Sequence, residues 1–278
     1  MTESDPSSMK NNKPRRRITK TVAMHYVKLV YRSVLFVTAL VFYIYGRING
    51  AESLFCGYEK NSVVLNVIWI VYMVEMILRL FPSRLESMGC QKQFKKNYKE
   101  IAPPTTRPKV HPWLVTFSVA SAWIALNAVI GVLYYTKLID TGILLLICLA
   151  YSVCDIVCIL FFCPFQTWFM KNKCCGSCRI YNWDYAMMFT PLIYVPNPYA
   201  LSLLGTALVI LGRWEYVYLR YPQRFSEEHN RSLSCAECTE KLCQHKRQLQ
   251  GFLKKGKHRI DGNSFIKGLI KKDEKVNK

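Results

Sequence analysis

The chain has 278 residues, of which 51% are hydrophobic and 13% aromatic, while only 20% are charged. Its 38 Lys and Arg residues outnumber 18 Asp and Glu residues, which gives a formal net charge of +20 at pH 7. Apolar stretches of about 20 residues recur, which is the length that a helix needs to cross a hydrocarbon core roughly 30 Å thick. This composition excludes a soluble globular protein, a disordered chain and a small disulfide-stapled scaffold. In a membrane protein the positive charge sets orientation, and we expect no nucleic-acid partner.

The N-terminal residues are polar and basic, and they predict a disordered tail over residues 1–26. The first apolar stretch is long and Tyr-rich and lacks a small-residue cleavage site, so we interpret it as a retained anchor and not a cleaved signal peptide. Five apolar segments predict transmembrane helices, and these run over residues 29–48, 63–81, 113–135, 142–162 and 199–219.

A sixth, shorter apolar segment covers residues 180–196. Seventeen residues of α-helix cover about 25 Å, which is nearly enough to cross the bilayer. We expect a kink at Pro191 and a turn at residues 196–198, because proline cannot continue a helix. Residues 180–219 are therefore predicted to form a helical hairpin.

Six crossings put both termini on the same side of the membrane, and the basic residues indicate that this side is the cytosol. Of the 38 Lys and Arg residues, all but Arg47, Lys60, Lys137 and Arg213 fall in segments that this topology places in the cytosol. A bias of this size follows the positive-inside rule. We therefore expect an all-α integral membrane protein with both termini cytosolic, located in the plasma membrane if the source is prokaryotic.

The predicted organisation alternates membrane segments with cytosolic ones. After the N-terminal tail come a first transmembrane helical pair (27–81), a basic cytosolic loop (82–112), a second helical pair (113–163), a Cys-rich cytosolic segment (164–179), the hairpin (180–219) and a Cys-rich, basic cytosolic tail (220–278).

Two Cys-x-x-Cys pairs in the cytosolic segments predict a metal site. Cys175 and Cys178 form the first pair, and Cys235 and Cys238 form the second. The predicted hairpin leaves and re-enters the same membrane surface between them, so pairs that are distant in sequence become close in space. Cytosolic thiols are kept reduced, which favours a ligand set over a disulfide set. The candidate additional ligands are Cys163, Cys174, Cys243 and His245.

Four thiolates suit a structural or regulatory zinc ion, with Zn–S bonds near 2.3 Å. They suit an iron–sulfur cluster equally well, which would make the chain a membrane electron-transfer protein. The cysteines within the fourth apolar segment, including Cys154 and Cys158, are interpreted as ordinary residues of an apolar chain.

Ionisable residues inside a membrane are costly, and four of them are candidates for a functional site in the bilayer. These are Glu75, Asp155, Arg213 and Glu215. Glu75 also lies four residues before Arg79, a spacing that favours an ion pair on one helix face. The alternative interpretation is structural, with a pair such as Asp155–Arg213 holding helices together.

The basic tail after residue 252 interleaves Lys with apolar residues, and this pattern predicts either an amphipathic helix on anionic lipid or a solvated tail. The sequence thus favours a membrane protein with a cytosolic zinc site and a transport or lipid-substrate site in the bilayer. The alternatives are the iron–sulfur protein and a metal-independent transporter. No catalytic motif indicates whether the chain is an enzyme.

Overall fold

The computed structural model describes residues 19–49, 63–82, 91–101, 113–170, 175–234, 238 and 242–249, without the side chain of residue 175. Five helices in this part of the chain are long and apolar enough to cross a membrane, which confirms the five longer predicted segments. They are α1 (Lys20–Ile48), α2 (Val63–Leu80), α4 (Trp113–Tyr135), α5 (Thr141–Leu160) and α7 (Pro198–Arg220).

Short helical elements connect or flank these five helices. They are η1 (Lys95–Asn97), the π-helical turn η2 (Phe165–Phe169), η3 (Cys175–Ser177), η4 (Arg179–Trp183), α6 (Asp184–Phe189), η5 (Thr190–Tyr194), η6 (Pro222–Phe225) and η7 (Arg231–Leu233). Residues 242–249 form one further helical stretch. Among the described residues the β-structure is a single bridge between Glu100 and Asn230.

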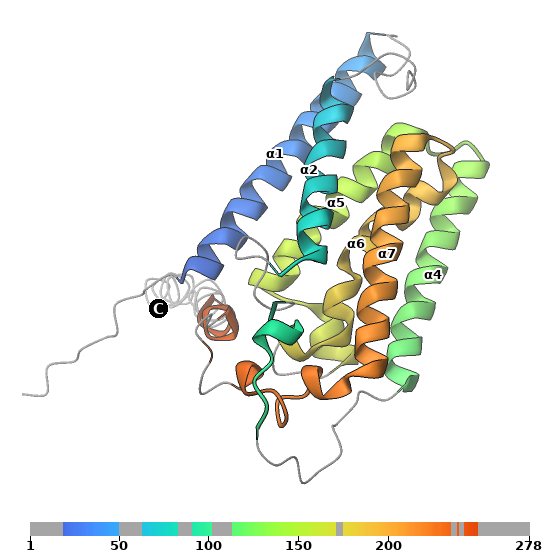
Figure 1. Cartoon of the computed structure of the whole chain (residues 1–278). Helices are drawn as coiled ribbons and strands as arrows, with labels where there is room; N and C mark the ends of the chain where they lie inside the picture. The colour runs from blue at the N-terminus through green and yellow to red at the C-terminus, as the bar shows by residue number, and fades with distance from the viewer. Residues whose placement is uncertain are drawn as a thin grey trace, which may run out of the picture.

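The long helices alternate in direction along the chain (Figure 1). Helix α1 packs against α5, while α7 packs against both α2 and α6. Half of the apolar stretch of α5 is buried inside the protein, against 11% for α1. The start of α1 and the end of α7 lie at the same end of the bundle (Figure 1). We call this end the N/C end.

Local sequence signals explain where three helices begin. The Thr19 side chain accepts a hydrogen bond from the backbone of Val22 and caps α1. Asp140 caps α5 by accepting from Ile143 N at 2.8 Å, and its other oxygen accepts from Tyr43 of α1. Asn197 caps α7, where a proline occupies the first helical position.

Helix α1 begins nine residues earlier than the predicted segment 29–48. The predicted segment began after Lys28, and the charge count assigned both Lys28 and Arg32 to the cytosol. In the structure both side chains lie near the Glu75 carboxylate inside the bundle. A charged residue that has a buried partner therefore does not mark the end of the helix.

The short segment 180–196 is not one kinked helix. It consists of η4, α6 and η5, and the change from α to 3₁₀ geometry falls at Thr190–Pro191. Proline at the second position of η5 lacks an N–H for an α-helical bond, so the α-helix ends just before it. A 3₁₀-helix rises about 2.0 Å per residue against 1.5 Å for an α-helix, so residues 179–194 cover about 29 Å.

Candidate functional site

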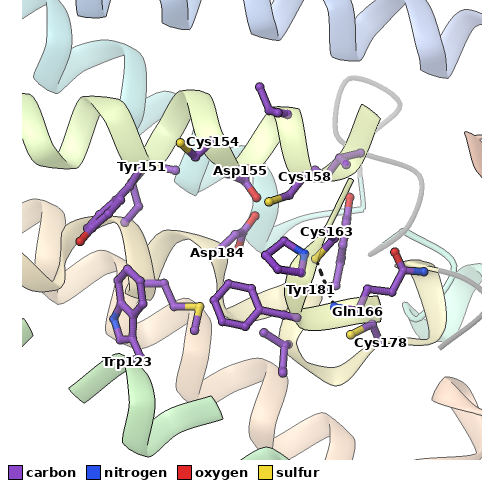
Figure 2. A pocket seen from close by; sticks show the side chains of 17 residues that line it. Trp123, Tyr151, Cys154, Asp155, Cys158, Cys163, Gln166, Cys178, Tyr181 and Asp184 are labelled. Carbon is purple, nitrogen blue, oxygen red and sulfur yellow. Dashed lines mark hydrogen bonds between the residues drawn. The ribbon is translucent and has the colours of Figure 1, made fainter. Parts of the chain in front are cut away.

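A cavity of about 430 Å³ lies at the N/C end of the bundle, between α4, α5, the turn after α5 and the segment η4–α6 (Figure 2). Most of its wall is apolar, with side chains that include Trp123, Val157, Ile159, Ile180, Met187 and Met188. The polar side chains that line it include Asp155, Gln166 and Asp184. A largely apolar cavity with a few convergent polar groups is typical of a small-molecule site.

The Asp155 carboxylate is held by a buried arginine of α1. Arg32 is 1% exposed. Its Nη1 donates to Asp155 Oδ2 at 3.2 Å and to the Ser152 carbonyl at 2.9 Å. Its Nη2 donates to Glu75 Oε2 of α2 at 2.7 Å. Arg32 thus joins α1, α2 and α5, and each charge in this cluster has an opposite charge beside it.

The Glu75 carboxylate has further partners. Lys28 Nζ lies 3.5 Å from Glu75 Oε1, and the Tyr185 hydroxyl donates to Oε2 at 3.3 Å. Because Tyr185 belongs to α6, the cluster also fixes the short segment against α2.

The second carboxylate of the cavity has an arginine of its own. Arg79 Nη1 lies 3.1 Å from Asp184 Oδ2, and Arg79 Nη2 donates to the Tyr181 carbonyl at 3.2 Å. The guanidinium also lies over the rings of Tyr181 and Tyr185, at 5.3 Å and 5.4 Å from their centroids. Two arginines on different helices therefore orient the two acids toward one cavity, as Figure 2 shows for the acids.

The predicted pair Asp155–Arg213 is not formed, since Asp155 pairs with Arg32. Arg213 instead donates to the Leu80 carbonyl and lies over the ring of Phe94. Its helical position turns it toward α2 and η1, away from α5.

Glu215 lies at the N/C end in a cluster of its own. Arg179 Nε donates to both of its carboxylate oxygens at 3.1 Å, and the Trp183 indole donates to Oε1 at 2.6 Å. The Arg179 guanidinium also stacks 4.4 Å from the centroid of Tyr218. This arrangement anchors η4 to the end of α7, and it does not line the cavity.

Two thiols lie together in the cavity wall. Cys158 belongs to the last turns of α5, and Cys163 follows where the chain has left the helix (Figure 2). A hydrogen bond from the Cys158 thiol, together with Gln166 N at 3.4 Å and the nearby Lys246 ammonium, lowers the pKa of Cys163 to about 6. Cys163 therefore holds the charge of the pair as a thiolate near neutral pH.

Helix 242–249 covers this part of the site. Lys246 Nζ donates to the Cys158 carbonyl and to Gln166 Oε1, both at 3.1 Å. His245 Nε2 lies 2.9 Å from the Tyr26 hydroxyl of α1. The C-terminal segment thus bridges α1, the end of α5 and the turn that carries Gln166.

The predicted metal ligands are only partly covered by the described residues. Cys174, Cys235 and the side chain of Cys175 fall outside them. Cys178 is buried against Val119, Met170 and Ile180, and it lines the cavity. Over the ranges that the structure describes, no three His, Cys, Asp or Glu side chains are grouped as metal ligands. The four-cysteine site thus stays a prediction.

Residues 92 and 93 lie between the two Cys-x-x-Cys pairs. Gln93 Nε2 donates to the Gly176 carbonyl at 2.7 Å, and Lys92 Nζ lies 3.6 Å from Cys238 Sγ. The fold therefore brings Gly176, which lies within the first pair, and Cys238 of the second pair to the same short segment. Cys243 lies half-buried in helix 242–249, beside His245.

Three features of the site were missed from the sequence. Arg32 was counted with the cytosolic tail, although its place 12 residues into an apolar helix was a signal. Cys158 was treated as an ordinary apolar residue, and the cavity itself has no linear signature. Comparison of the chain with known protein families, with curated proteins and with solved structures gives no match.

Proposed function

We propose that this chain is a polytopic membrane protein that binds a small amphiphile in the cavity between α4, α5 and η4–α6, as a transport or lipid-substrate site. The observation that carries the proposal is the cavity itself. Its volume of about 430 Å³ falls in the range typical of small-molecule pockets. Its apolar wall suits a hydrocarbon chain, since burying each CH₂ group contributes about 0.8 kcal/mol.

The carboxylates at one side of the cavity determine which amphiphile head groups can bind there. The Asp155 side chain is 21% exposed even though Arg32 holds one of its oxygens. A carboxylate accepts hydrogen bonds and repels another anion, so the site favours an amine or hydroxyl head over a carboxylate head.

Native mass spectrometry of the delipidated protein tests this proposal with dodecylamine, dodecanol and dodecanoic acid as probes. We expect one dodecylamine or dodecanol per chain and little dodecanoic acid. Met187→Trp places an indole in the cavity and should abolish this adduct. Val209→Trp should retain it, because Val209 of α7 does not line the cavity and is 61% exposed. Equal retention by wild type and Met187→Trp, or a preference for the acid, would contradict the proposal.

We place both termini in the cytosol, with segment 179–194 as a sixth crossing. The rise of about 29 Å along η4, α6 and η5 supports this assignment, because it nearly equals the thickness of the hydrocarbon core. The positive-inside bias supports the cytosolic side. A reporter that is active only outside the cytosol should be active when fused after residues 55, 138 and 196. A reporter that is active only in the cytosol should be active when fused after residues 100 and 225. A cytosolic reporter at residue 196 would refute the sixth crossing.

A second proposed function is structural or regulatory zinc binding by Cys175, Cys178, Cys235 and Cys238. It is favoured by the contacts of Gln93 with Gly176 and of Lys92 with Cys238, which bring one residue from each Cys-x-x-Cys stretch to the same segment. Such a site would tie the start of η4 to the chain that follows α7.

Elemental analysis of protein purified without oxygen tests the metal proposal. We expect about one zinc per chain in wild type and in Cys154→Ser, and loss of zinc in Cys235→Ser/Cys238→Ser. Iron with sulfide and visible colour would support the iron–sulfur protein instead. Absence of any metal would refute both.

A further inference from the structure

The cavity is covered toward the N/C end of the bundle. A small hydrophobic cluster of buried residues lies there, formed by Val119, Met170, Cys178 and Ile180. Beside it, Lys246 Nζ of the C-terminal segment donates to Gln166 Oε1 at 3.1 Å, and both residues are buried. The described side chains at this end therefore separate the cavity from the cytosolic side that we propose for it.

An aromatic contact marks the opposite end of the cavity. Trp123 of α4 and Tyr151 of α5 lie together there, with their ring centroids 5.0 Å apart (Figure 2). The Trp123 indole also donates to the Thr190 hydroxyl at 3.4 Å, at the start of η5. Helices α4 and α5 and the segment η5 therefore meet at this end.

The side of the cavity along α5 is open. Cys154 and Val157 both line the cavity, and both are exposed at the protein surface, Val157 to 37%. They are three residues apart, so they share one face of α5. Helices α4 and α5 are long and apolar enough to cross a membrane. In a bilayer this side opening, defined by Cys154 and Val157, would face lipid.

The side opening lies near one end of its helix. Val157 is three residues before the end of α5 at Leu160, which is about 4.5 Å along the helix axis. Asp155 also lines the cavity, and it is the sequence neighbour of Cys154. A polar head group at the membrane interface therefore has only a short way to the Asp155 carboxylate, while an apolar chain passes Cys154 and Val157.

We propose that the amphiphile enters the cavity sideways from the bilayer, through the side opening between α5 and α4. This inference rests on the amphiphile site of the proposed function, and it identifies the ligand as a lipid dissolved in the membrane. An apolar chain stays in apolar surroundings along this route. Entry from water would instead expose the chain and would require the covered N/C end to open.

Photolabelling of full-length protein in vesicles tests the route. The probe is a phosphatidylcholine with a diazirine at the end of one acyl chain, which stays in its bilayer and reaches the cavity only from the side. Met188 is buried and lines the cavity, whereas Met76 is equally buried in the core and does not. Peptide-level mass spectrometry compares the label on these two methionines.

We expect about tenfold more label on Met188 than on Met76, because a close-packed core leaves no space for a chain. Val157→Trp narrows the side opening and should lower the Met188 label several-fold. Val132→Trp is the matched control, because Val132 is also an exposed valine of a long apolar helix but does not line the cavity. It should leave the Met188 label unchanged.

A second probe separates this inference from the proposed function. Dodecanol with a diazirine on its chain is small enough to fit the cavity whole, and it is added from water. Met188 labelled by dodecanol but not by phosphatidylcholine would overturn the side route and leave the amphiphile site standing. Met188 labelled by neither probe would overturn both. Equal phosphatidylcholine label on Met188 in wild type and Val157→Trp would also overturn the side route.

Discussion

Replacing Arg32 with methionine tests whether the buried charge cluster holds the bundle together. Arg32 is 1% exposed and contacts carboxylates on two other helices, Glu75 at 2.7 Å and Asp155 at 3.2 Å. Removing one partner of a buried ion pair costs about 3–5 kcal/mol, because a buried charge is left uncompensated. Here Lys28 still lies 3.5 Å from Glu75, and the Asp155 side chain is 21% exposed. We therefore expect the lower end of that range, about 3 kcal/mol of unfolding free energy.

Unfolding in mixed micelles of dodecyl maltoside and increasing SDS, followed by far-UV circular dichroism, measures this change. Neutralising both acids as well, in Arg32→Met/Glu75→Gln/Asp155→Asn, should recover most of the lost free energy of unfolding, since of this cluster only the Lys28 ammonium then carries a charge, and its side chain is 14% exposed. A loss of less than about 1 kcal/mol in Arg32→Met would show that the cluster does not hold the bundle together. A triple variant no more stable than Arg32→Met would contradict the charge argument.

Two further predictions concern a helix contact and the reactive thiol. A Cβ at Gly131 would lie 2.5 Å from the ring of Tyr194, so Gly131→Leu should displace that ring, break its bond to the Asn127 carbonyl and cost about 1–3 kcal/mol in the same unfolding assay. Gly205→Leu, which points into open space, should cost nothing, and equal losses would contradict the packing argument. The rate of Cys163 alkylation should rise with pH through about 6 and then level off, because only the thiolate reacts. Peptide-level mass spectrometry measures this rate, and a midpoint near the usual value of about 8.5 would refute the assigned thiolate.

The five long helices were predictable because apolar length alone specifies them. The start of α1 was not, because the positive-inside rule counts a basic residue without knowing its partners. Arg32 is an example, since its two carboxylates come from helices that are far along the chain. Lys28, which was assigned to the cytosol for the same reason, lies beside one of them.

Single residues of the site could be identified from the sequence, but their arrangement in space could not. Asp155 was singled out because an acid in an apolar helix is costly, but its partner was assigned wrongly, since Arg213 faces α2 and not α5. That Cys158 and Cys163 both line the cavity depends on the chain leaving α5 at Leu160. Pro164 indicates that the helix ends nearby, but not that both thiols then face one cavity. The cavity depends on which faces of α4, α5 and α6 meet, and linear sequence does not encode this directly.

Trp123 lines the cavity in which we propose that an amphiphile binds. The most direct test is quenching of Trp123 fluorescence by an alkylamine that carries bromine on its chain, taken as the difference between wild type and Trp123→Phe. We expect saturable quenching of the Trp123 contribution by the amine, and much weaker quenching by the matching brominated carboxylic acid. Quenching that never saturates, or that is equal for the amine and the acid, would contradict this proposal.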